Sequence, residues 1–292
     1  MARRRLLSDL PLVSVVVPCY NHARYITQCI ESIVAQNYPN IELLVIDDGS
    51  VDDSPRILEE LAALHGFSLR IQSNHGLLPT LNMALNEVHG EYFAPFASDD
   101  VMLPGRIALQ VAHMQAHPEV AICGGNIIPI DEQGKVLEKK RRNRPSRRLD
   151  FDSIFKNLLP GAPAPTFLMR RDVVLQVGGY DPNLRIEDLT MMLKICQAGY
   201  VVDVLKEEMA CYRTHAENTH GNIRFMLDEV LKIYALFADH PDYQQVCLSH
   251  RKSMFLKAAK LDKPLAREII RQIPLRFWDR KTVRGLARLY MT

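Results

Sequence analysis

The sequence predicts an α/β fold in which a mostly parallel sheet is flanked by helices. In the first hundred residues, short runs rich in Val and Ile alternate with segments whose apolar residues recur at helical spacing. A continuous apolar run is typical of a strand buried on both faces, as the strands of parallel sheets are. The chain of 292 residues, 47% apolar and 24% charged, is long enough for one such domain and a smaller appendage.

Four strands are expected in this first part of the chain. The β-branched run from Val13 to Val17 is the first, and we expect Pro18 to end it. The other three are predicted over residues 41–46, 69–71 and 92–96.

Helices are predicted between these strands. Ser54 followed by Pro55 favours a helix start, with serine as the cap and proline in the first turn. A further helix is predicted over Leu81 to Val88. The apolar side chains that mark the buried faces of the first two helices are Ile26, Cys29, Ile30, Ile33, Ile57, Leu58, Leu61 and Leu64.

After Asp100 the pattern is less regular, and from Phe225 onward the chain is expected to be helical throughout. No internal repeat or low-complexity linker is found, so the tail is interpreted as an extension of the domain. In between, we predict helices over residues 107–115 and 189–197, and strands over 120–123, 127–130 and 167–169.

The six cysteines are scattered without a CxxC pair, which favours reduced thiols in a cytoplasmic protein over a disulfide framework or a zinc site. The N-terminal arginines, Arg3 to Arg5, are followed by too few apolar residues for a secretory signal. No segment reaches the roughly 18 uninterrupted apolar residues of a membrane-spanning helix. We therefore expect a soluble or surface-bound protein.

Polar residues gather where three of the predicted strands end, at 18–21, 47–52 and 98–100. Ligands of an open parallel sheet bind beyond the carboxyl ends of its strands. Each cluster alone could be an ordinary turn, because Asp, Asn, Gly and Ser are common in turns for backbone reasons. Three such clusters, two of them with paired acids, favour a binding site.

The acid pair Asp99-Asp100 favours a metal site, with Asp47-Asp48 nearby in the fold. Neighbouring carboxylates repel each other unless a cation neutralises them. Hard divalent cations are bound by one or two carboxylates, with water and phosphate oxygens as the remaining ligands. The pair therefore predicts Mg²⁺ or Mn²⁺ holding a diphosphate.

Four segments, in order, resemble family 2 glycosyltransferases, which have the GT-A fold. The stretch VSVVVPCYNHARYITQCIESIVAQNYPNIELLVIDDGSVDDS resembles the opening of that family, and NHGLLPTLNMALNEVHGEYFAPFASDD resembles the part that ends in its DxD-type metal motif. GGYDPNLRIEDLTMMLKICQAGY resembles the segment with the acceptor-side Glu-Asp pair, and YRTHAENTH resembles the Arg-x-His element that follows it. The resemblance covers residues from about 12 to 220.

The resemblance implies a GT-A catalytic domain over residues 1–222 and a helical, basic C-terminal extension over 223–292. Within the domain, residues from about 12 to 100 would form the nucleotide-binding half and 101–222 the acceptor half. It also implies a nucleotide-sugar donor, a glycan acceptor, and Mn²⁺ or Mg²⁺ as the cofactor.

The resemblance assigns roles to individual residues as well. Asp188 would be the catalytic base, with Glu187 beside it. Asp100 would ligate the metal, and Asp99 would contact the ribose or sugar while sharing the metal site. The motif commonly begins with an acid where this chain has Ala97, which makes the remaining pair more critical. The residues that would bind the nucleotide sugar are Pro18, Tyr20, Asn21, Asp48, Asp99, Arg213 and His215, with Asp48 on the base and the last two near the diphosphate.

The chemistry agrees with these roles. A sugar hydroxyl is a poor nucleophile, so a carboxylate must accept its proton as it attacks the anomeric carbon. The metal, Arg213 and His215 could neutralise the leaving diphosphate. A base on the acceptor side of the anomeric carbon and a metal on the leaving-group side indicate a single in-line displacement. Such a displacement inverts the configuration of that carbon. Taken alone, Glu187-Asp188 could instead be acids that favour a helix start, and His215 could be a surface histidine.

The C-terminal tail is strongly basic. From Arg251 to Thr292 there are twelve Lys or Arg against three acids, a net charge of +9. Between Arg276 and Tyr290, aromatic and aliphatic residues alternate with basic ones, which suits a helix on an anionic membrane at the cytoplasmic face of the inner membrane. A helix packed on the catalytic domain explains the pattern equally well. No nucleic-acid motif accompanies the charge, so nucleic acid is not an expected partner.

We predict an inverting, metal-dependent glycosyltransferase of bacterial surface-polysaccharide assembly. Around FAPFASDDVMLPGRI it resembles rhamnosyltransferases of lipopolysaccharide core or O-antigen, which implies dTDP-L-rhamnose as donor, with UDP-hexoses as alternatives, and a lipid-linked acceptor. A sugar-phosphate nucleotidyltransferase would share the sheet, acids and metal, but should carry a Gly-rich basic phosphate loop, and PCYNHARY is not one. A non-catalytic glycan-binding module would not need the two acid pairs.

Overall fold

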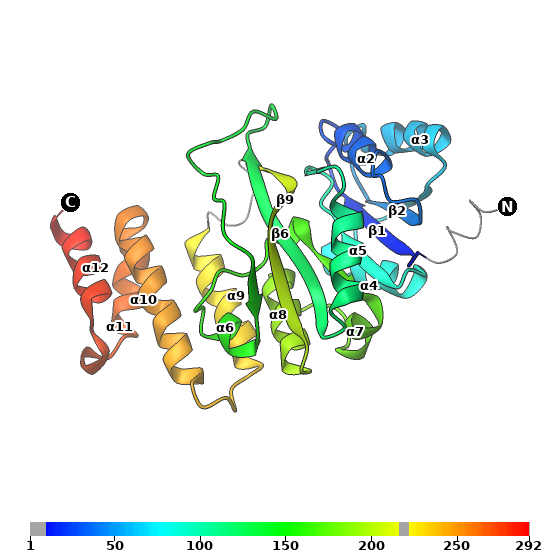
Figure 1. Ribbon diagram of the computed structural model, residues 1–292. Helices are drawn as coiled ribbons and strands as arrows, with labels where there is room; N and C mark the ends of the chain where they lie inside the picture. The colour runs from blue at the N-terminus through cyan, green and yellow to red at the C-terminus, as the bar shows by residue number, and fades with distance from the viewer. Residues whose placement is uncertain (1–9, 216–221, 292) are drawn as a thin grey trace. The chain divides into compact units, whose positions relative to one another are not determined.

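The structure is a computed structural model that describes residues 10–215 and 222–291. The chain divides into two compact units (Figure 1). The first contains the residues up to 183 together with 187–215, and the second contains 184–186 and the residues from 216 onward. Each unit is described separately.

The described part of the first unit contains one nine-stranded sheet, in the order β3-β2-β1-β4-β8-β6-β9-β5, with β7 paired to β9. Strands β3, β2, β1 and β4 are parallel to one another, and β6 is parallel to β9. Strand β8 runs antiparallel between β4 and β6, and β5 and β7 are antiparallel to β9. The strands are β1 Val13–Cys19, β2 Ile41–Asp48, β3 Ser68–Gln72, β4 Tyr92–Pro95, β5 Val101–Met102, β6 Val120–Ile130, β7 Arg147–Leu149, β8 Leu168–Arg170 and β9 Val201–Arg213.

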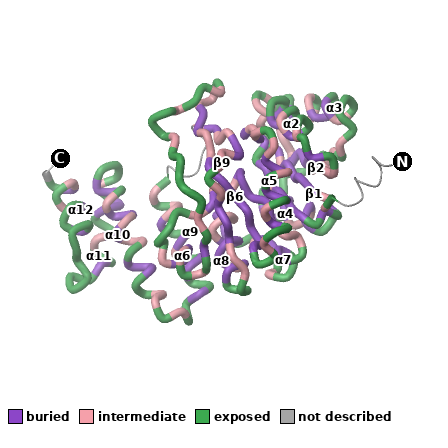
Figure 2. The backbone as a smooth tube through the Cα atoms, in the orientation of Figure 1, coloured by how far each residue is buried: buried purple, intermediate pink, exposed green. Residues whose placement is uncertain are grey.

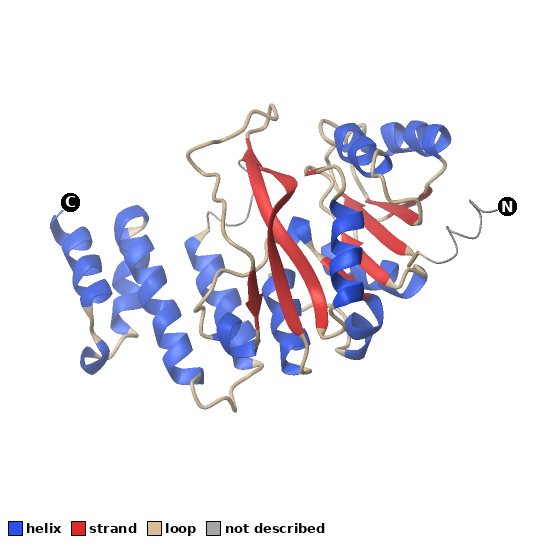
Figure 3. Ribbon diagram, viewed as in Figure 1, coloured by secondary structure: helices blue, strands red, loops and turns tan. Residues whose placement is uncertain are grey.

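Helices flank this sheet, as the sequence predicts (Figure 3). Val13, Val15 and Val17 of β1 are fully buried in a core that they share with side chains of α2, α3 and α5. Figure 2 shows the central strands buried and the connecting loops largely exposed. The helices of this unit are α2 Ile26–Val34, α3 Ser54–His65, α4 Leu77–Glu87, α5 Arg106–Ala116, α6 Phe151–Phe155, α7 Arg171–Gln176 and α8 Glu187–Gln197.

Pro18 does not end the first strand, contrary to the prediction. Val16 directs its carbonyl toward β4, where it accepts from the backbone N–H of Phe96. Pro18 lies two residues further along β1, so its backbone nitrogen also faces the β4 side of the strand. The pairing of β1 with β4, however, ends at Pro95. The missing N–H of Pro18 therefore costs no ladder bond, and the strand continues beside β2.

The predicted strands over 120–123 and 127–130 are one strand, β6. Its register against β9 shifts around Gly124 and Asn126, where β-bulges let the ladder continue. The partner strand β9, Val201–Arg213, was not predicted, because charged side chains interrupt its apolar residues.

The described part of the second unit is helical, as expected from Phe225 onward. Its helices are α9 Ile223–Ala235, α10 Tyr243–Leu261, α11 Lys263–Arg271 and α12 Arg280–Met291. No helix in the described ranges is long and apolar enough to cross a membrane.

One stripe of α12 packs within this unit. Leu289 and Thr282 are buried, and Lys252 of α10 pairs with Asp279 at 2.9 Å just before the helix begins. Gly285 lies so close to Phe255 that an added Cβ would meet Cε1 of its fully buried ring at 2.2 Å. The tail is thus an integral layer of the second unit.

Gly285→Ala should destabilise the protein, although alanine is intrinsically the better helix residue by about 1 kcal/mol. The Phe255 ring cannot move away without disturbing the core, so we expect a net loss of roughly 1–3 kcal/mol in the free energy of unfolding. Urea denaturation measures it. The control is Ala287→Gly at an exposed position two residues on, which reports helix propensity alone. A gain in stability for Gly285→Ala would show that α12 does not pack on α10.

Candidate active site at the carboxyl edge of the sheet

The polar turns that follow β1 and β2 are joined by hydrogen bonds. The backbone N–H groups of Asn21 and His22 donate to the hydroxyls of Ser50 and Ser54, at 2.9 and 3.1 Å. Asn21, at a left-handed φ of 55°, accepts in return from the backbone N–H of Val51. The prediction that Ser54 caps its helix is therefore wrong: its hydroxyl holds the turn after β1, and Asp53 is the N-cap residue.

Asp48 organises the loop that follows β3. Its carboxylate accepts from the backbone N–H groups of His75 and Gly76 at 2.9 and 2.8 Å, and from Nε2 of Gln72 at 2.8 Å. Burial alone would raise the pKa of Asp48, but these hydrogen bonds outweigh it and lower the pKa below its ordinary value. Asp48 is therefore an anion fixed at the end of β2, and its predicted contact with a base stays a prediction.

Asp100 is buried beneath the turn that follows β4, with 1% of its surface exposed. Its Oδ1 accepts from the backbone N–H of Arg213 at 2.8 Å. Burial, followed by the charge of Asp99, raises the pKa of Asp100 well above its ordinary value, and Arg213 only partly offsets this.

Arg213 is committed to protein atoms at this turn. Its Nε donates to the carbonyl of Asp99 at 2.7 Å, and Nη1 donates to the carbonyls of Asp131 and Glu132. Its guanidinium also lies over the ring of Tyr25, 4.6 Å from the centroid. These contacts fix the turn, so the predicted contact of Arg213 with a diphosphate stays a prediction.

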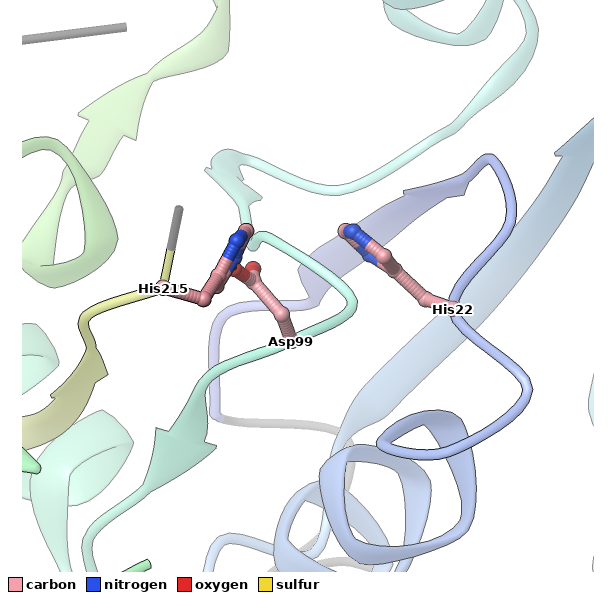
Figure 4. A group of neighbouring side chains, drawn as sticks. All are labelled: His22, Asp99 and His215. Atoms are coloured by element: carbon pink, nitrogen blue, oxygen red, sulfur yellow. The ribbon is translucent and has the colours of Figure 1, made fainter. Parts of the chain in front are cut away.

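Asp99 points toward His215, and His22 lies nearby (Figure 4). Its Oδ2 lies 2.9 Å from Nε2 of His215, and each of these two side chains is 11% exposed. His22 approaches from the turn after β1, with Nδ1 2.7 Å from Oγ of Ser98. One ligand atom from each of His22, Asp99 and His215 lies within 4.8 Å of the other two.

A second acid pair opens helix α8. Burial, followed by the charge of Asp188, raises the pKa of Glu187 to about 7. Oδ1 of Asp188 accepts from the backbone N–H of Leu189 at 2.7 Å. The charges of both acid pairs also act on Tyr212: burial is the main cause that raises its pKa to about 12, and Asp100, Asp99, Asp188 and Glu187 all add to it.

The structure thus brings most of the predicted site residues to one edge of the sheet. Pro18 lies in β1, and Tyr20 is 48% exposed in the turn beside Asn21. The sequence analysis missed His22, which lies within the quoted stretch PCYNHARY, and Tyr212, which precedes Arg213 in β9. Metal-binding residue types within the first polar turn were the available signal for His22.

An α/β sheet with acidic turns at its carboxyl edge and a second acid pair at the start of a neighbouring helix defines a glycosyltransferase of the GT-A class. The chain belongs to glycosyl transferase family 2, whose family model matches residues 14–178. The match to the family model confirms the resemblance to family 2 glycosyltransferases that the sequence motifs indicated.

Relatives of this chain are described as glycosyltransferases. EpsE of Bacillus subtilis (strain 168), a candidate glycosyltransferase, is 27% identical over 245 residues, covering 77% of this chain and 81% of EpsE. The amylovoran biosynthesis glycosyltransferase AmsE of Erwinia amylovora is 27% identical over 210 residues, covering 70% and 77%. An uncharacterized glycosyltransferase of Rickettsia felis is 35% identical, but the match spans 51% of this chain and 25% of that protein.

Solved structures share the fold. Residues 1–349 of S. aureus TarS, in complex with UDP-GlcNAc, superpose with a TM-score of 0.65 at 18% identity, covering 91% of this chain and 82% of that one. The mannosyltransferase PcManGT from Pyrobaculum calidifontis, in complex with GDP-Man and Mn²⁺, gives a TM-score of 0.58 at 16% identity, covering 98% and 89%.

The raised pKa of Glu187 makes stability depend on pH. The folded state holds this proton up to a pH of about 7, whereas the unfolded chain releases it near 4.5. Between these values the folded state binds more protons, so this group lowers stability as pH rises. Glu187→Gln should remove that slope and melt higher than the wild type at pH 8. Melting curves from pH 4.5 to 8 test this, with exposed Glu59→Gln as control; equal slopes for all three proteins would contradict it.

Proposed function

We propose that the protein is an inverting glycosyltransferase that moves a sugar from a nucleotide diphosphate to a glycan acceptor, using a divalent cation. The observation that supports this most directly is the meeting of Asp99 with His22 and His215 at the ends of β4, β1 and β9. Two acid pairs also lie near enough to Tyr212 of β9 to raise its pKa. One pair, Asp99-Asp100, adjoins two imidazoles that suit a cation, and the other, Glu187-Asp188, suits a base.

The residues present fit a divalent cation, Mn²⁺ or Mg²⁺. The carboxylate of Asp99 and the ring nitrogens of His22 and His215 are within 4.8 Å of one another, and oxygen and nitrogen ligands of this kind bind such ions. Asp100, as the second member of the predicted metal pair, supports the turn through Arg213. When bound, the cation would neutralise the diphosphate that leaves.

Asp188 is our candidate for the base. A proton retained by Glu187 lets its neighbour carry the negative charge without a second buried anion beside it. Asp188 would then accept the proton of the acceptor hydroxyl as that oxygen attacks the anomeric carbon. The C–O bond to the diphosphate breaks as the new C–O bond forms on the opposite face, which inverts the configuration.

The nucleotide would lie along the turns after β1 and β2. Pro18 lies near the end of β1, and Tyr20 and Asn21 lie in the turn that follows it. The anion of Asp48 lies at the end of β2, where it could accept a hydrogen bond from the base. His215 and Arg213 lie at the Asp99 turn, where a diphosphate bound to the cation would be.

For substrates, we propose a role in the assembly of a bacterial surface polysaccharide, since the AmsE relative is described as an amylovoran biosynthesis glycosyltransferase. The acceptor would be a lipid-linked or lipopolysaccharide-like glycan. The donor proposed first is dTDP-L-rhamnose and then a UDP-hexose. The solved neighbours in complex with UDP-GlcNAc and GDP-Man add those two donors to the set to be screened.

Asp188→Asn keeps size and hydrogen bonding but cannot accept a proton. We expect its turnover to fall by roughly 10²–10⁴ with little change in donor affinity. The donor is first identified by the rise in melting temperature that a bound nucleotide sugar causes with Mn²⁺, and transfer or hydrolysis of that donor is then measured.

The matched variant is Glu187→Gln, which replaces the protonated member of the pair and should lose much less activity. A larger loss for Glu187→Gln than for Asp188→Asn would reverse the two roles. Release of pyrophosphate from a nucleoside triphosphate and a sugar phosphate would favour the nucleotidyltransferase alternative. Donor binding without any turnover would favour a binding module.

We also propose that the second unit contacts an anionic membrane surface. Besides the stripe of α12 that packs on α10, the tail exposes Leu275, Val283 and Tyr290 at 75%, 60% and 70%. Basic side chains surround them, at Arg276, Arg280, Lys281 and Arg284, and all of these residues are exposed. Exposed apolar and basic groups together are typical of peripheral membrane contacts.

Replacing Arg276, Arg280 and Arg284 by Gln should weaken binding to phosphatidylglycerol vesicles about 100-fold, because each basic residue near an anionic surface contributes about 1 kcal/mol. Truncation is not a suitable test, since α12 is part of the fold. Cosedimentation measures binding, and fluorescence of the single tryptophan, Trp278, which is 36% exposed, reports insertion.

Two controls make this measurement specific. Lys139, Lys140 and Arg142 are exposed in the first unit, so their replacement by Gln removes the same charge elsewhere. Binding should also weaken steeply with salt, since the Debye length falls from about 10 Å at 0.1 M to about 3 Å at 1 M. Equal losses for both triple variants would point to general charge and against a membrane face on the tail.

A further inference from the structure

His22, Asp99 and His215 come from three separate segments of the first unit and converge on one point (Figure 4). His22 follows β1, Asp99 follows β4, and His215 follows β9. A ring nitrogen from each histidine and a carboxylate oxygen of Asp99 are all within 4.8 Å of one another. Only the tertiary fold creates this cluster, because the three residues are 77 and 116 positions apart in the sequence (99 − 22 and 215 − 99).

Each member of the cluster is held in place by the surrounding structure. The backbone N–H of His22 donates to Ser54, and its Nδ1 contacts Oγ of Ser98 at 2.7 Å. A second hydrogen bond of this kind fixes the ring of most metal-binding histidines and raises their basicity. The ring of His215 stacks on Tyr25, with centroids 6.0 Å apart and an interplanar angle of 22°. The two imidazole rings are therefore already in position and need little reorganisation to bind a metal ion.

We propose that His22 is a third protein ligand of the catalytic cation, beside Asp99 and His215, and that the two imidazoles select a transition metal such as Mn²⁺ over Mg²⁺. This rests on the proposed metal-dependent function and narrows its choice of Mn²⁺ or Mg²⁺. Mg²⁺ prefers an all-oxygen octahedron and keeps several waters, whereas imidazole nitrogens suit transition metals.

The same geometry assigns a different task to Asp100. Its carboxylate is almost completely buried and accepts from the backbone N–H of Arg213, which ties the turn to the end of β9. His22 thus takes the ligand position that the sequence analysis had given to Asp100. The site then presents one carboxylate and two imidazole rings, and so offers the cation fewer negatively charged ligands than a pair of aspartates would. Its affinity for the cation should accordingly increase when a nucleoside diphosphate supplies further oxygens.

The test is Mn²⁺ binding, which does not require turnover. The free Mn²⁺ remaining in a titration of the full-length protein is measured by electron paramagnetic resonance, alone and with UDP, dTDP or GDP. His22→Ala should weaken Mn²⁺ binding by roughly 10–100-fold, the range found when groups supporting a metal are removed. Asp99→Asn should cost at least as much, and Asp100→Asn, which can still accept from Arg213, much less. His65→Ala, at the exposed end of α3, should change nothing.

His22→Asp separates a ligand from a merely structural residue. It replaces a nitrogen ligand by an oxygen ligand, so Mn²⁺ binding should persist while the ratio of Mn²⁺ to Mg²⁺ affinity falls by about tenfold or more. Calorimetry with each metal gives that ratio. Melting curves without metal identify any variant that is simply less well folded.

Three outcomes would overturn the proposal. These are unchanged Mn²⁺ affinity in a folded His22→Ala variant, a greater loss for Asp100→Asn than for His22→Ala, and absence of Mn²⁺ binding to the wild type with every nucleotide.

Failure of the proposed glycosyltransferase function would give different results. If Mn²⁺ binding depends on His22 but no donor is turned over, the metal site stands and the transferase assignment falls. If transfer is metal-dependent and His22→Ala binds Mn²⁺ normally, the transferase assignment stands and the proposal that His22 is a metal ligand falls.

Discussion

The buried guanidinium of Arg213 constrains the whole site, because a cation removed from water must have its donors satisfied by the protein. Nε and Nη1 donate to carbonyls of the turn after β4 and of the loop after β6, at Asp99, Asp131 and Glu132. The backbone N–H of the same residue donates to Asp100. One side chain at the end of β9 therefore sets the positions of the ends of two other strands. Removing it would leave these carbonyls without their donors, at a cost of about 1–3 kcal/mol for each carbonyl that stays buried and unpaired.

Fixing that turn also determines where its two acids point. Asp100 is drawn under the turn by the backbone of Arg213, and Asp99 is left facing His215. The turn after β1 is fixed independently, through N–H groups that donate to Ser50 and Ser54, and this brings His22 to the same place. Rigid scaffolding from three segments is what positions a cation site accurately enough for catalysis.

The features that were predicted correctly are those encoded locally. Apolar runs and their polar ends identified the parallel strands and the Asp99-Asp100 pair, because burial and turn formation leave signatures within a few residues. The Glu187-Asp188 pair came from the family resemblance, since acids at a helix start are common for local reasons. Strand β9 has no such signature, since charged residues interrupt its apolar residues without a regular period. Pro18 continues β1 only because the neighbouring strand β4 stops first. The role of His22 depends on Ser98, 76 residues away, and no local pattern reports a contact of that kind.

The electrostatics of the two acid pairs follow one rule. In each pair the environment makes one carboxyl hard to ionise: burial raises the pKa of Asp100, and burial also raises that of Glu187. Asp99 and Asp188 are the members of the two pairs that we propose to face the cation and the acceptor. Four full charges around Tyr212 would repel one another strongly, whereas one anion per pair is tolerable. A raised pKa in one member of each pair lowers the negative charge that this part of the fold must hold, and so reconciles the density of acids with a stable fold.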